Sequence, residues 1–340
     1  MSKIKIMDQL LNDKYCLYNG DSVDILNEFP DESVGYSLFS PPFMDLYVYS
    51  DSERDMGNSK NNNEFWNHFD YLIKELYRIT IPGRCVSIHC SHVPTKKAWD
   101  GIIALKDFPG DIIRIFEDNG FLFHSPVTIW KDPLIETVRT NAKGLLYKQL
   151  CKDSACSRQG LADYIITMRK KGDNPYPIEH DIYKGLGVYQ GKKEFAPDIQ
   201  KIENDILCSE INTYTKEELD KLKTLNYNHR VWQLYASPVW MDIRQTHVLQ
   251  KKDARDAEDE KHICPLQLDT VHRCITMWSN ENDIVLDPFM GIGTVGYKSI
   301  ELNRRFVGSE LKKSYYLQSI KNVKKLLLIR VIKYYKEIIL

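Results

Sequence analysis

The sequence predicts an α/β protein built on a doubly wound, mostly parallel sheet. Short apolar runs alternate with segments of helical period over residues 15–130, and the alternation returns over residues 265–310. Two of the apolar runs end in loops with polar side chains, at Ser40 and at Asp287. Ligands of open α/β sheets bind at the carboxyl ends of the strands, so these two loops predict the functional edge.

The composition is that of a folded globular protein without a global basic character. The 340 residues are 43% hydrophobic, and 46 Lys and Arg nearly balance 47 Asp and Glu. A nucleic-acid ligand therefore needs a local basic surface. No stretch approaches the roughly 18 apolar residues of a membrane span, and residues 1–9 contain no apolar run of the kind found in signal peptides. We expect a cytoplasmic protein without a membrane partner, whose eight cysteines are reduced.

The first elements lead to one edge of the predicted sheet. Residues 15–18 read as a strand, Asp21 or Ser22 can cap a short helix that Pro30 closes, and residues 34–39 read as the next strand. Such a βαβ unit predicts that its two strands pair in parallel. Asp21 and Ser40 then both lie at carboxyl ends.

The loop after the second strand, Ser40-Pro41-Pro42-Phe43, has the chemistry of a grip for a planar amine. Two prolines fix two φ angles and remove two N–H donors, which leaves neighbouring carbonyls free to accept hydrogen bonds. Ser40 adds an acceptor oxygen and Phe43 adds a π-face. An ordinary Pro-Pro turn is the alternative.

The following elements continue the alternation. A polar stretch, 49–63, suits either a loop over a site or an inert surface loop. A helix is predicted over 64–79, a strand over 84–90, a helix over 111–119 and a strand over 121–130.

Between residues 131 and 250 the regular alternation is lost. Basic residues with interleaved tyrosines are dense in its first third; they are Lys148, Lys152, Arg158, Arg169, Lys170, Lys171, Tyr147 and Tyr164. Such residues can follow a phosphate backbone and stack on bases, whereas a solvated surface with core tyrosines is the alternative.

Alternation returns with a nucleoside-binding pattern. A helix from Pro265 precedes a buried-type strand, 284–287, which runs into Asp287-Pro288-Phe289-Met290-Gly291-Ile292-Gly293-Thr294. A helix over 295–302 and a strand over 305–309 follow, and that strand ends on Glu310. The glycines allow close approach of the backbone to a ligand, and the terminal acid can bind ribose hydroxyls.

The charge at this turn favours S-adenosylmethionine over NAD. The turn lacks the third glycine of the dinucleotide fingerprint, and the carboxylate of Asp287 directly precedes it. A pyrophosphate is disfavoured there, whereas a ligand with an ammonium and a sulfonium is favoured. A metal centre is not predicted, because the spacing of His262, Cys264, His272 and Cys274 fits no common zinc pattern.

The two motifs, Asp287 to Thr294 and Ser40 to Phe43, closely resemble those of the DNA amino-methyltransferases that modify exocyclic nitrogens of cytosine or adenine. The amine motif precedes the cofactor motif, as in the circularly permuted β group of that family. The sequences Asp55-Met56-Gly57-Asn58, Trp130-Lys131-Asp132-Pro133 and Cys264-Pro265-Leu266-Gln267-Leu268 are similar to those of a group common in phages and prophages.

This resemblance implies a Rossmann-like methyltransferase fold, circularly permuted, with an inserted target-recognition region. The catalytic and cofactor-binding domain would comprise 1–130 and 251–320, the target-recognition region 131–250, and a helical tail 321–340. Glu310 would bind the ribose and Asp21 would lie near the adenine. The remaining cofactor pocket would come from the turn, namely from Asp287, Pro288, Phe289, Gly291, Gly293 and Thr294.

The resemblance also implies which residues act on the target. Ser40, Pro41, Pro42 and Phe43 would hold the base, and a serine before Pro-Pro is more typical of the cytosine-N4 enzymes than of the adenine-N6 enzymes. The strand over 84–90 has no acid, so an assisting base is expected from elsewhere. This sequence has Val295 at a position where members of that family frequently have a second threonine.

Several alternatives stay open from the sequence. The expected partner is double-stranded DNA, with or without a restriction endonuclease, and the protein is a monomer or a homodimer. Adenine N6, an RNA or a protein are other acceptors for the same chemistry, and a non-catalytic DNA-binding subunit is an alternative of another class. The tail can pack on the sheet, pair with a second subunit or touch a membrane.

Overall fold

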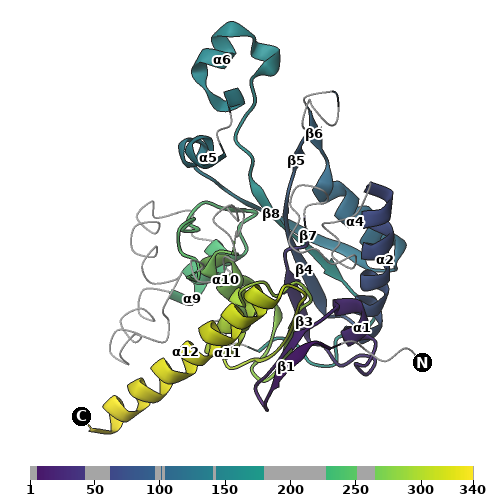
Figure 1. Ribbon diagram of the computed structural model, residues 1–340, viewed down its shortest axis with the longest axis vertical. Helices are drawn as coiled ribbons and strands as arrows, with labels where there is room; N and C mark the ends of the chain where they lie inside the picture. The colour runs from purple at the N-terminus through teal and green to yellow at the C-terminus, as the bar shows by residue number, and fades with distance from the viewer. Residues whose placement is uncertain are drawn as a thin grey trace.

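A computed structural model describes residues 6–42, 62–95, 101, 104–140, 143–179, 227–250 and 265–339. Its centre is a nine-stranded sheet in the order β1-β2-β11-β10-β3-β4-β8-β7-β9 (Figure 1). Helices cover both faces of this mostly parallel sheet, so the predicted fold class is confirmed.

The middle of the sheet is parallel and its margins contain the antiparallel pairs. The five parallel strands are β2 (Tyr15–Asn19), β11 (Arg305–Glu310), β10 (Ile284–Asp287), β3 (Tyr36–Phe39) and β4 (Cys85–Ser91). At one margin, β1 (Asp8–Leu11) pairs antiparallel with β2. At the other, the sheet ends with β8 (Asp163–Arg169), β7 (Leu122–Ile129) and β9 (Val239–Trp240).

The prediction that the first two parallel strands pair with one another is wrong. Strands β10 and β11 lie between β2 and β3, with Phe306 opposite Tyr15 and Val285 opposite Tyr36. Both inserted strands are largely buried, so each needs a neighbour on either side. The connection through α1 (Ser22–Leu26) crosses three strand spacings, roughly 14 Å, instead of one.

Strand β8 is a second departure from the prediction. It falls inside the range 131–250, for which the sequence predicts no regular alternation, yet it pairs antiparallel with β4 along its whole length. It also pairs antiparallel with β7, so residues 121–130 do not complete a parallel repeat. The chain leaves the sheet after β7 and returns to it at β8, so the sequence does not reveal that these two strands are neighbours.

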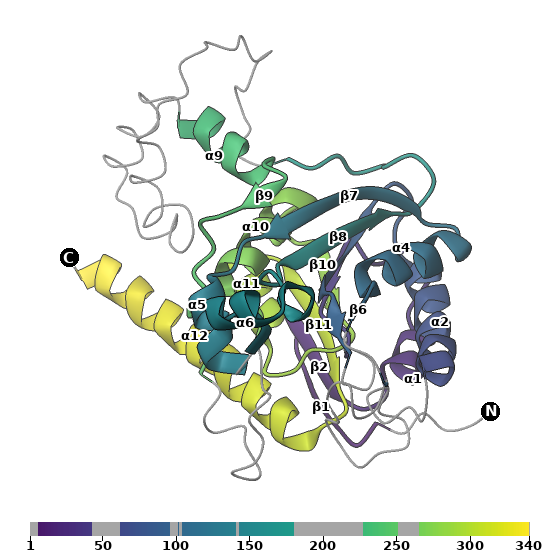
Figure 2. The same cartoon turned by 90° about the horizontal axis from the view of Figure 1, so that it is seen from above.

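Two helical layers enclose the sheet, as Figure 2 shows. One face is covered by α1, α2 (Asn62–Ile79) and α4 (Phe108–Asp118). The opposite face is covered by α10 (Leu268–Trp278), α11 (Thr294–Glu301) and the first part of α12 (Lys313–Ile339), next to α9 (Tyr227–Tyr235). Apolar side chains of α2 and α10 are buried in these two layers, among them Phe65, Phe69 and Leu72 of α2 and Val271 and Ile275 of α10.

Helix boundaries differ from the predictions where capping decides them. Helix α4 starts at Phe108, three residues earlier than expected, because the Asp107 carboxylate accepts a hydrogen bond from Gly110 N at 3.2 Å. Helix α10 starts at Leu268 instead of Pro265, since Gln267 is its extended N-cap. The C-terminal tail is helical as predicted, but its helix already begins at Lys313.

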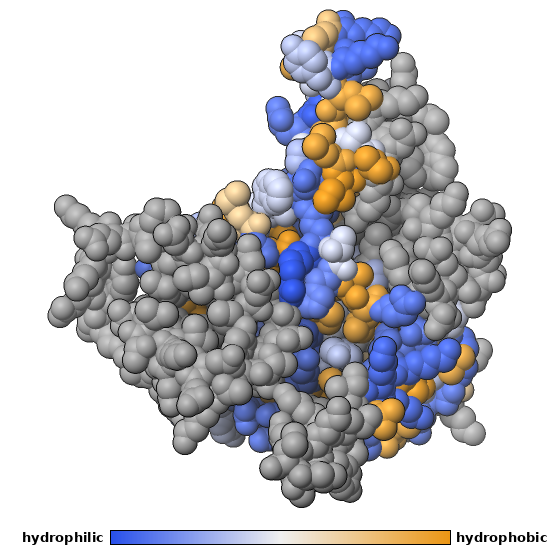
Figure 3. Space-filling model, turned by 90° about the vertical axis from the view of Figure 1, so that its left-hand side faces the viewer, coloured by the Kyte–Doolittle hydropathy of each residue, from blue (hydrophilic) through white to orange (hydrophobic). Residues whose placement is uncertain are grey.

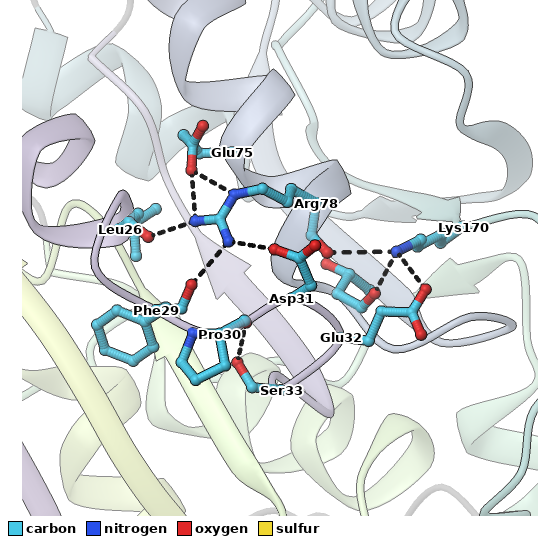
Figure 4. A network of polar contacts seen from close by, with 10 residues as sticks. Leu26, Phe29, Pro30, Asp31, Glu32, Ser33, Glu75, Arg78 and Lys170 are labelled. Carbon is cyan, nitrogen blue, oxygen red and sulfur yellow. Dashed lines mark hydrogen bonds and ion pairs between the residues drawn. The ribbon is translucent and has the colours of Figure 1, made fainter.

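A polar network fixes the α1–β3 connection beneath α2 (Figure 4). The Arg78 guanidinium donates to the carbonyls of Leu26 and Phe29, at 2.9 and 2.7 Å, and pairs with Asp31 at 2.6 Å. The Lys170 ammonium donates to the Thr80 carbonyl at 2.8 Å. Lys170 is buried at the amino-terminal side of β3 and β4, so it lies on neither of the two surfaces considered for the basic residues, a DNA-facing one or a solvated one.

Two parts of the chain leave the body of the molecule. Between β7 and β8, short helices stand off the sheet as an arm (Figure 1). We define the arm as residues 133–140 and 143–156; it comprises α5 (Pro133–Thr140), η3 (Lys143–Leu145), α6 (Tyr147–Lys152) and η4 (Ser154–Cys156). The far end of α12 also extends beyond the sheet.

Strands β5 (Val93–Pro94) and β6 (Leu105–Lys106) pair antiparallel in a separate two-stranded sheet. Within the described ranges, no helix has the length and apolarity to cross a membrane.

Candidate active site

The predicted site residues meet along one edge of the sheet. Strands β2, β11, β10 and β3 are neighbours and run in the same direction. Asp21, Glu310, Asp287 and Ser40 stand at or just beyond their carboxyl ends, in that order. Residues far apart in sequence are therefore placed on one functional edge.

The glycines of the turn after β10 have conformations that other residues rarely adopt. Gly291 has φ 53° and Gly293 has φ 85°. A Cβ at Gly293 would lie 2.9 Å from Ser319 Cβ, so α12 packs directly on this turn. Gly293 is the N-cap of α11, and Thr294 is its first residue. The turn thus requires glycine at both positions for its backbone conformation, and at Gly293 also for the close packing of α12.

Two acids frame the turn. Oδ1 of Asp287 accepts a hydrogen bond from Phe289 N at 2.9 Å. The carboxylate of Glu310 accepts one from Gly291 N and one from Lys312 N, each at 2.8 Å. On the neighbouring strand, Asp21 caps α1 through its contact with Val23 N at 2.9 Å. The acids are held by backbone N–H groups and therefore have fixed positions.

The Asp287 carboxyl is electrostatically strained. Its side chain is buried, and burial raises its pKa well above the usual range. The Phe289 N–H opposes that shift, while the negative Glu310 reinforces it. A buried acid with a second acid nearby favours a bound cation, because the cation offsets the cost of ionising both.

Phe289 connects the turn with the strand that leads to Ser40. Its ring lies 5.7 Å from the ring of Phe39 and 6.5 Å from that of Phe69, measured between centroids. Pro288 is buried beside it. The turn and the Ser40 loop are therefore packed as one unit.

Ser40 lies half-buried at the end of β3, followed by the buried Pro41 and Pro42. Phe43 lies outside the described residues, so the fourth member of the motif has no described position. Ser40 Oγ lies 3.3 Å from Nδ1 of His89. His89 is on β4, where the pairing of Phe39 with Ile88 brings it alongside Ser40.

A chain of polar groups continues from His89. Its Nε2 lies 3.3 Å from Oδ2 of Asp163, and Asp163 forms an ion pair with Lys131. Burial raises the pKa of the Asp163 carboxyl, but His89 and Lys131 outweigh that effect and lower it to about 2. Asp163 is therefore a carboxylate at neutral pH.

Sequence reasoning missed His89, Asp163 and Lys131. The strand over 84–90 has no acid, which predicts an assisting base from elsewhere, whereas the polar partner of Ser40 is a histidine on that strand. The acid begins β8, where it lies opposite both Ser91 and Ile129. No local signal in the sequence reveals this pairing, because β8 is joined to its neighbours through long connections.

The remaining residues singled out in the sequence, namely the basic and tyrosine residues of 131–250 and the His and Cys residues near α10, lie in different parts of the structure. Tyr164 lies against the His92 ring, at 5.3 Å between centroids, while Tyr147, Lys148 and Lys152 are exposed on the arm. His272 and Cys274 are buried in α10, and His262 and Cys264 lie outside the described residues. The described residues contain no cluster of His, Cys, Asp or Glu able to hold a metal.

Comparison with solved structures shows the same fold. TTHA0409 of Thermus thermophilus, solved with S-adenosyl-L-methionine, superposes with a TM-score of 0.55 at 21% identity, covering 91% of this chain and 93% of that one. The PvuII DNA methyltransferase, described as cytosine-N4-specific, has a TM-score of 0.54 at 16% identity, covering 96% and 95%.

Comparison with curated proteins finds type II methyltransferases. M.BglII of Bacillus subtilis and M.BamHI of Bacillus amyloliquefaciens are each 24% identical to this chain and match 88% and 87% of it. The chain spans 66% of the length of the first relative and 54% of the second. A family model described as "DNA methylase", for N6 and N4 methyltransferases, matches residues 35–321. The chain therefore belongs to this DNA methylase family.

Proposed function

We propose that the protein transfers a methyl group from S-adenosylmethionine to an exocyclic amine of a flipped base in double-stranded DNA, with cytosine N4 as the favoured acceptor. The observation that carries this proposal is the adjacency of the Asp287 turn and the Ser40 loop. They end neighbouring parallel strands and share the Phe39–Phe289 ring contact. Family membership supports the same reaction class.

The residues at the turn fit this cofactor. S-adenosylmethionine supplies a methyl group on a sulfonium, and its positive charges suit the strained carboxyl of Asp287. Glu310, fixed at the end of β11, is placed to accept from ribose hydroxyls, and Asp21 lies beyond it on the side of β2. TTHA0409, which shares the fold, was solved with this cofactor.

The Ser40 loop is the proposed grip for the target amine. The lone pair of an exocyclic amine is delocalised into its ring, which makes the nitrogen a poor nucleophile. If Ser40 Oγ and the Pro41 carbonyl each accept one N–H, the nitrogen can pyramidalise and direct its lone pair at the methyl carbon. Orientation and exclusion of water then supply several kcal/mol of the rate enhancement. Phe43 is the proposed stacking surface for the flipped base.

Cytosine is favoured because a serine precedes Pro41-Pro42, and adenine N6 is the alternative. PvuII DNA methyltransferase, which shares the fold, is described as specific for cytosine N4. The order of the two motifs along the chain supports placement in the circularly permuted β group. Two arrangements fit this function: the enzyme works alongside a restriction endonuclease, or it is an orphan methyltransferase without such a partner.

We assign DNA recognition to the region 131–250, and within it to the arm. Figure 3 shows hydrophilic and apolar side chains interspersed along the arm. Leu134, Val138 and Tyr147 are 75, 87 and 79% exposed, and Lys148 and Lys152 are exposed beside them. The arm leaves the sheet at Lys131, next to the Ser40–His89 contact, so DNA bound there would also reach the proposed grip. Large exposed apolar residues beside cations suit a surface that grips and distorts a duplex.

Replacing Lys148 and Lys152 together with alanine is expected to weaken DNA binding uniformly across sequences. The slope of log affinity against log salt should become shallower by about 2, because each lysine displaces roughly one counterion. Binding is measured by fluorescence anisotropy at several salt concentrations. The matched control replaces Lys321 and Lys324, which are exposed on α12. Equal salt slopes for the two double variants would remove the arm from the DNA interface.

The variant Asp287→Asn separates cofactor binding from stability. A raised pKa means that the folded protein binds more protons than the unfolded chain above the ordinary carboxyl range, so Asp287 destabilises the fold increasingly as pH rises. We expect the ligand-free variant to melt at a higher temperature than wild type, with a larger gain at pH 8 than at pH 5. Its affinity for S-adenosylmethionine, measured by calorimetry, should fall on the order of tenfold or more. Unchanged affinity would contradict the cofactor assignment.

Replacing Ser40 with alanine tests the amine grip. We expect methyl transfer from labelled S-adenosylmethionine to duplex DNA to fall on the order of 100-fold, since loss of orientation costs about that much, while cofactor affinity stays close to wild type. Ser33→Ala, near the opposite end of β3, is the control and should retain activity. Wild-type turnover in the Ser40 variant would exclude the proposed role. Transfer to RNA in preference to duplex DNA would instead favour the RNA alternative.

A further inference from the structure

We propose that His89 is a positioning residue for this reaction. Its imidazole fixes the direction of the Ser40 hydroxyl, so that Ser40 Oγ accepts from the target amine, and it takes up the proton that leaves the amine. This inference rests on the proposed methyl transfer to an amine. It is argued from the chain of contacts that joins Ser40, His89, Asp163 and Lys131.

The surroundings of His89 select one of its two neutral tautomers. Nε2 faces the carboxylate of Asp163 at 3.3 Å, and a carboxylate can only accept. An unprotonated Nε2 would bring two lone pairs together in a buried place, so Nε2 carries the hydrogen. Nδ1 is then an acceptor, and Ser40 Oγ, at 3.3 Å, donates its hydrogen to it.

This direction matters for the amine grip. A serine hydroxyl has one hydrogen and two lone pairs, and in solvent the hydrogen rotates freely. Once the hydrogen is committed to His89, only lone pairs of Ser40 Oγ remain for an N–H of the target. Both 3.3 Å contacts are long, and Nε2 faces the Asp163 carboxylate without a well-aligned hydrogen bond in the resting structure. Catalytic hydrogen bonds often shorten only when substrate binds.

The contacts of Asp163 with Lys131 and His89 favour its ionised form, although the side chain is buried. Asp163 is 4% exposed and would be costly to ionise alone, but Lys131 forms an ion pair with its other oxygen. The two partners come from different strands, since Lys131 follows β7 and His89 is on β4. The fold thus holds a buried negative charge directly behind the imidazole, which stabilises that ring when it is protonated.

Ser40 and His89 account for the proton that leaves the amine, and the sulfur of the methyl donor takes the electron pair. The amine nitrogen forms a bond to the methyl carbon, the carbon–sulfur bond breaks, and its electron pair goes to sulfur. The alkylated nitrogen gives a proton to Ser40 Oγ while the Ser40 hydroxyl proton passes to Nδ1 of His89. The imidazolium faces Asp163 and later releases the proton to solvent. No oxidant or further reactant is needed.

Other titratable groups lie near this end of β4. Asp163 and Lys131 are the charged groups behind His89. His92 and Asp107 contact one another at 3.6 Å, and burial raises the pKa of the Cys90 thiol. His92 serves as a matched control, because it is a second histidine near the end of β4 with its own carboxylate partner.

The test is the variant His89→Gln, assayed across pH. The glutamine oxygen can accept from Ser40, but the side chain cannot take up a proton. We expect kcat to fall on the order of 100-fold with cofactor and DNA affinity unchanged, and the acid limb of the kcat profile to disappear. His92→Gln should retain both the rate and the acid limb. A His89 variant with wild-type kcat and an intact acid limb would overturn the proposal.

A measurement on the resting protein separates this inference from the proposed function. Nitrogen-15 NMR of the histidine rings distinguishes the tautomers, with His89→Gln used to assign the signal. We expect neutral His89 to carry its hydrogen on Nε2, both in wild type and in Ser40→Ala. A hydrogen on Nδ1 overturns the proposal whether or not the protein methylates DNA. Failure of wild type to methylate DNA, with the Nε2 tautomer present, would overturn the function and the proton step assigned to His89.

Discussion

The whole site depends on the insertion of β10 and β11 between β2 and β3. Pairing of β10 with β3 places the Asp287 turn beside the Ser40 loop, and pairing of β11 with β2 places Glu310 beside the segment that carries Asp21. With the inserted order, the carboxyl ends of four parallel strands carry Asp21, Glu310, Asp287 and Ser40 in succession. The register of Leu286 with Ser37 and the ring contact between Phe39 and Phe289 then fix the distance between cofactor turn and amine grip. Sheet pairing therefore does the positioning that a two-substrate reaction requires.

Two buried acids on this edge have opposite electrostatic situations. Asp163 has His89 on one side and Lys131 on the other, which lowers its pKa to about 2 and favours its carboxylate form. Asp287 has a backbone donor and a neighbouring acid, which leaves its pKa raised and its charge without a cationic partner among the described residues. The first arrangement suits a group that supports a neighbouring imidazole, and the second suits a group that receives a cationic ligand. In the proposed function, the Asp163 side of this edge thus serves the target amine and the Asp287 side binds the cofactor.

The sequence predicted the fold class and most of the candidate site because its signals there are local. Strand, glycine turn and helix follow one another around Asp287 to Thr294, and the Ser40 loop directly follows an apolar run, so their position at a sheet edge needs no long-range information. The neighbours of β2 and β3 in the sheet could not be predicted. Strands β10 and β11 are far away in the sequence, and nothing local shows that they occupy the buried positions between β2 and β3. Asp163 was missed for the same reason. The sequence of its strand does not reveal which strands lie beside it, and only its pairing with β4 and β7 brings its carboxylate to His89.

The central claim is that the Ser40 loop presents an exocyclic amine of a DNA base to a methyl donor bound at the Asp287 turn. The most direct measurement is mass spectrometry of nucleosides from duplex DNA incubated with the protein and deuterium-labelled S-adenosylmethionine. The account predicts labelled N4-methylcytosine in the digest. Labelled N6-methyladenine would keep the amine grip but contradict the preference for cytosine, and the absence of labelled nucleosides would contradict the claim itself.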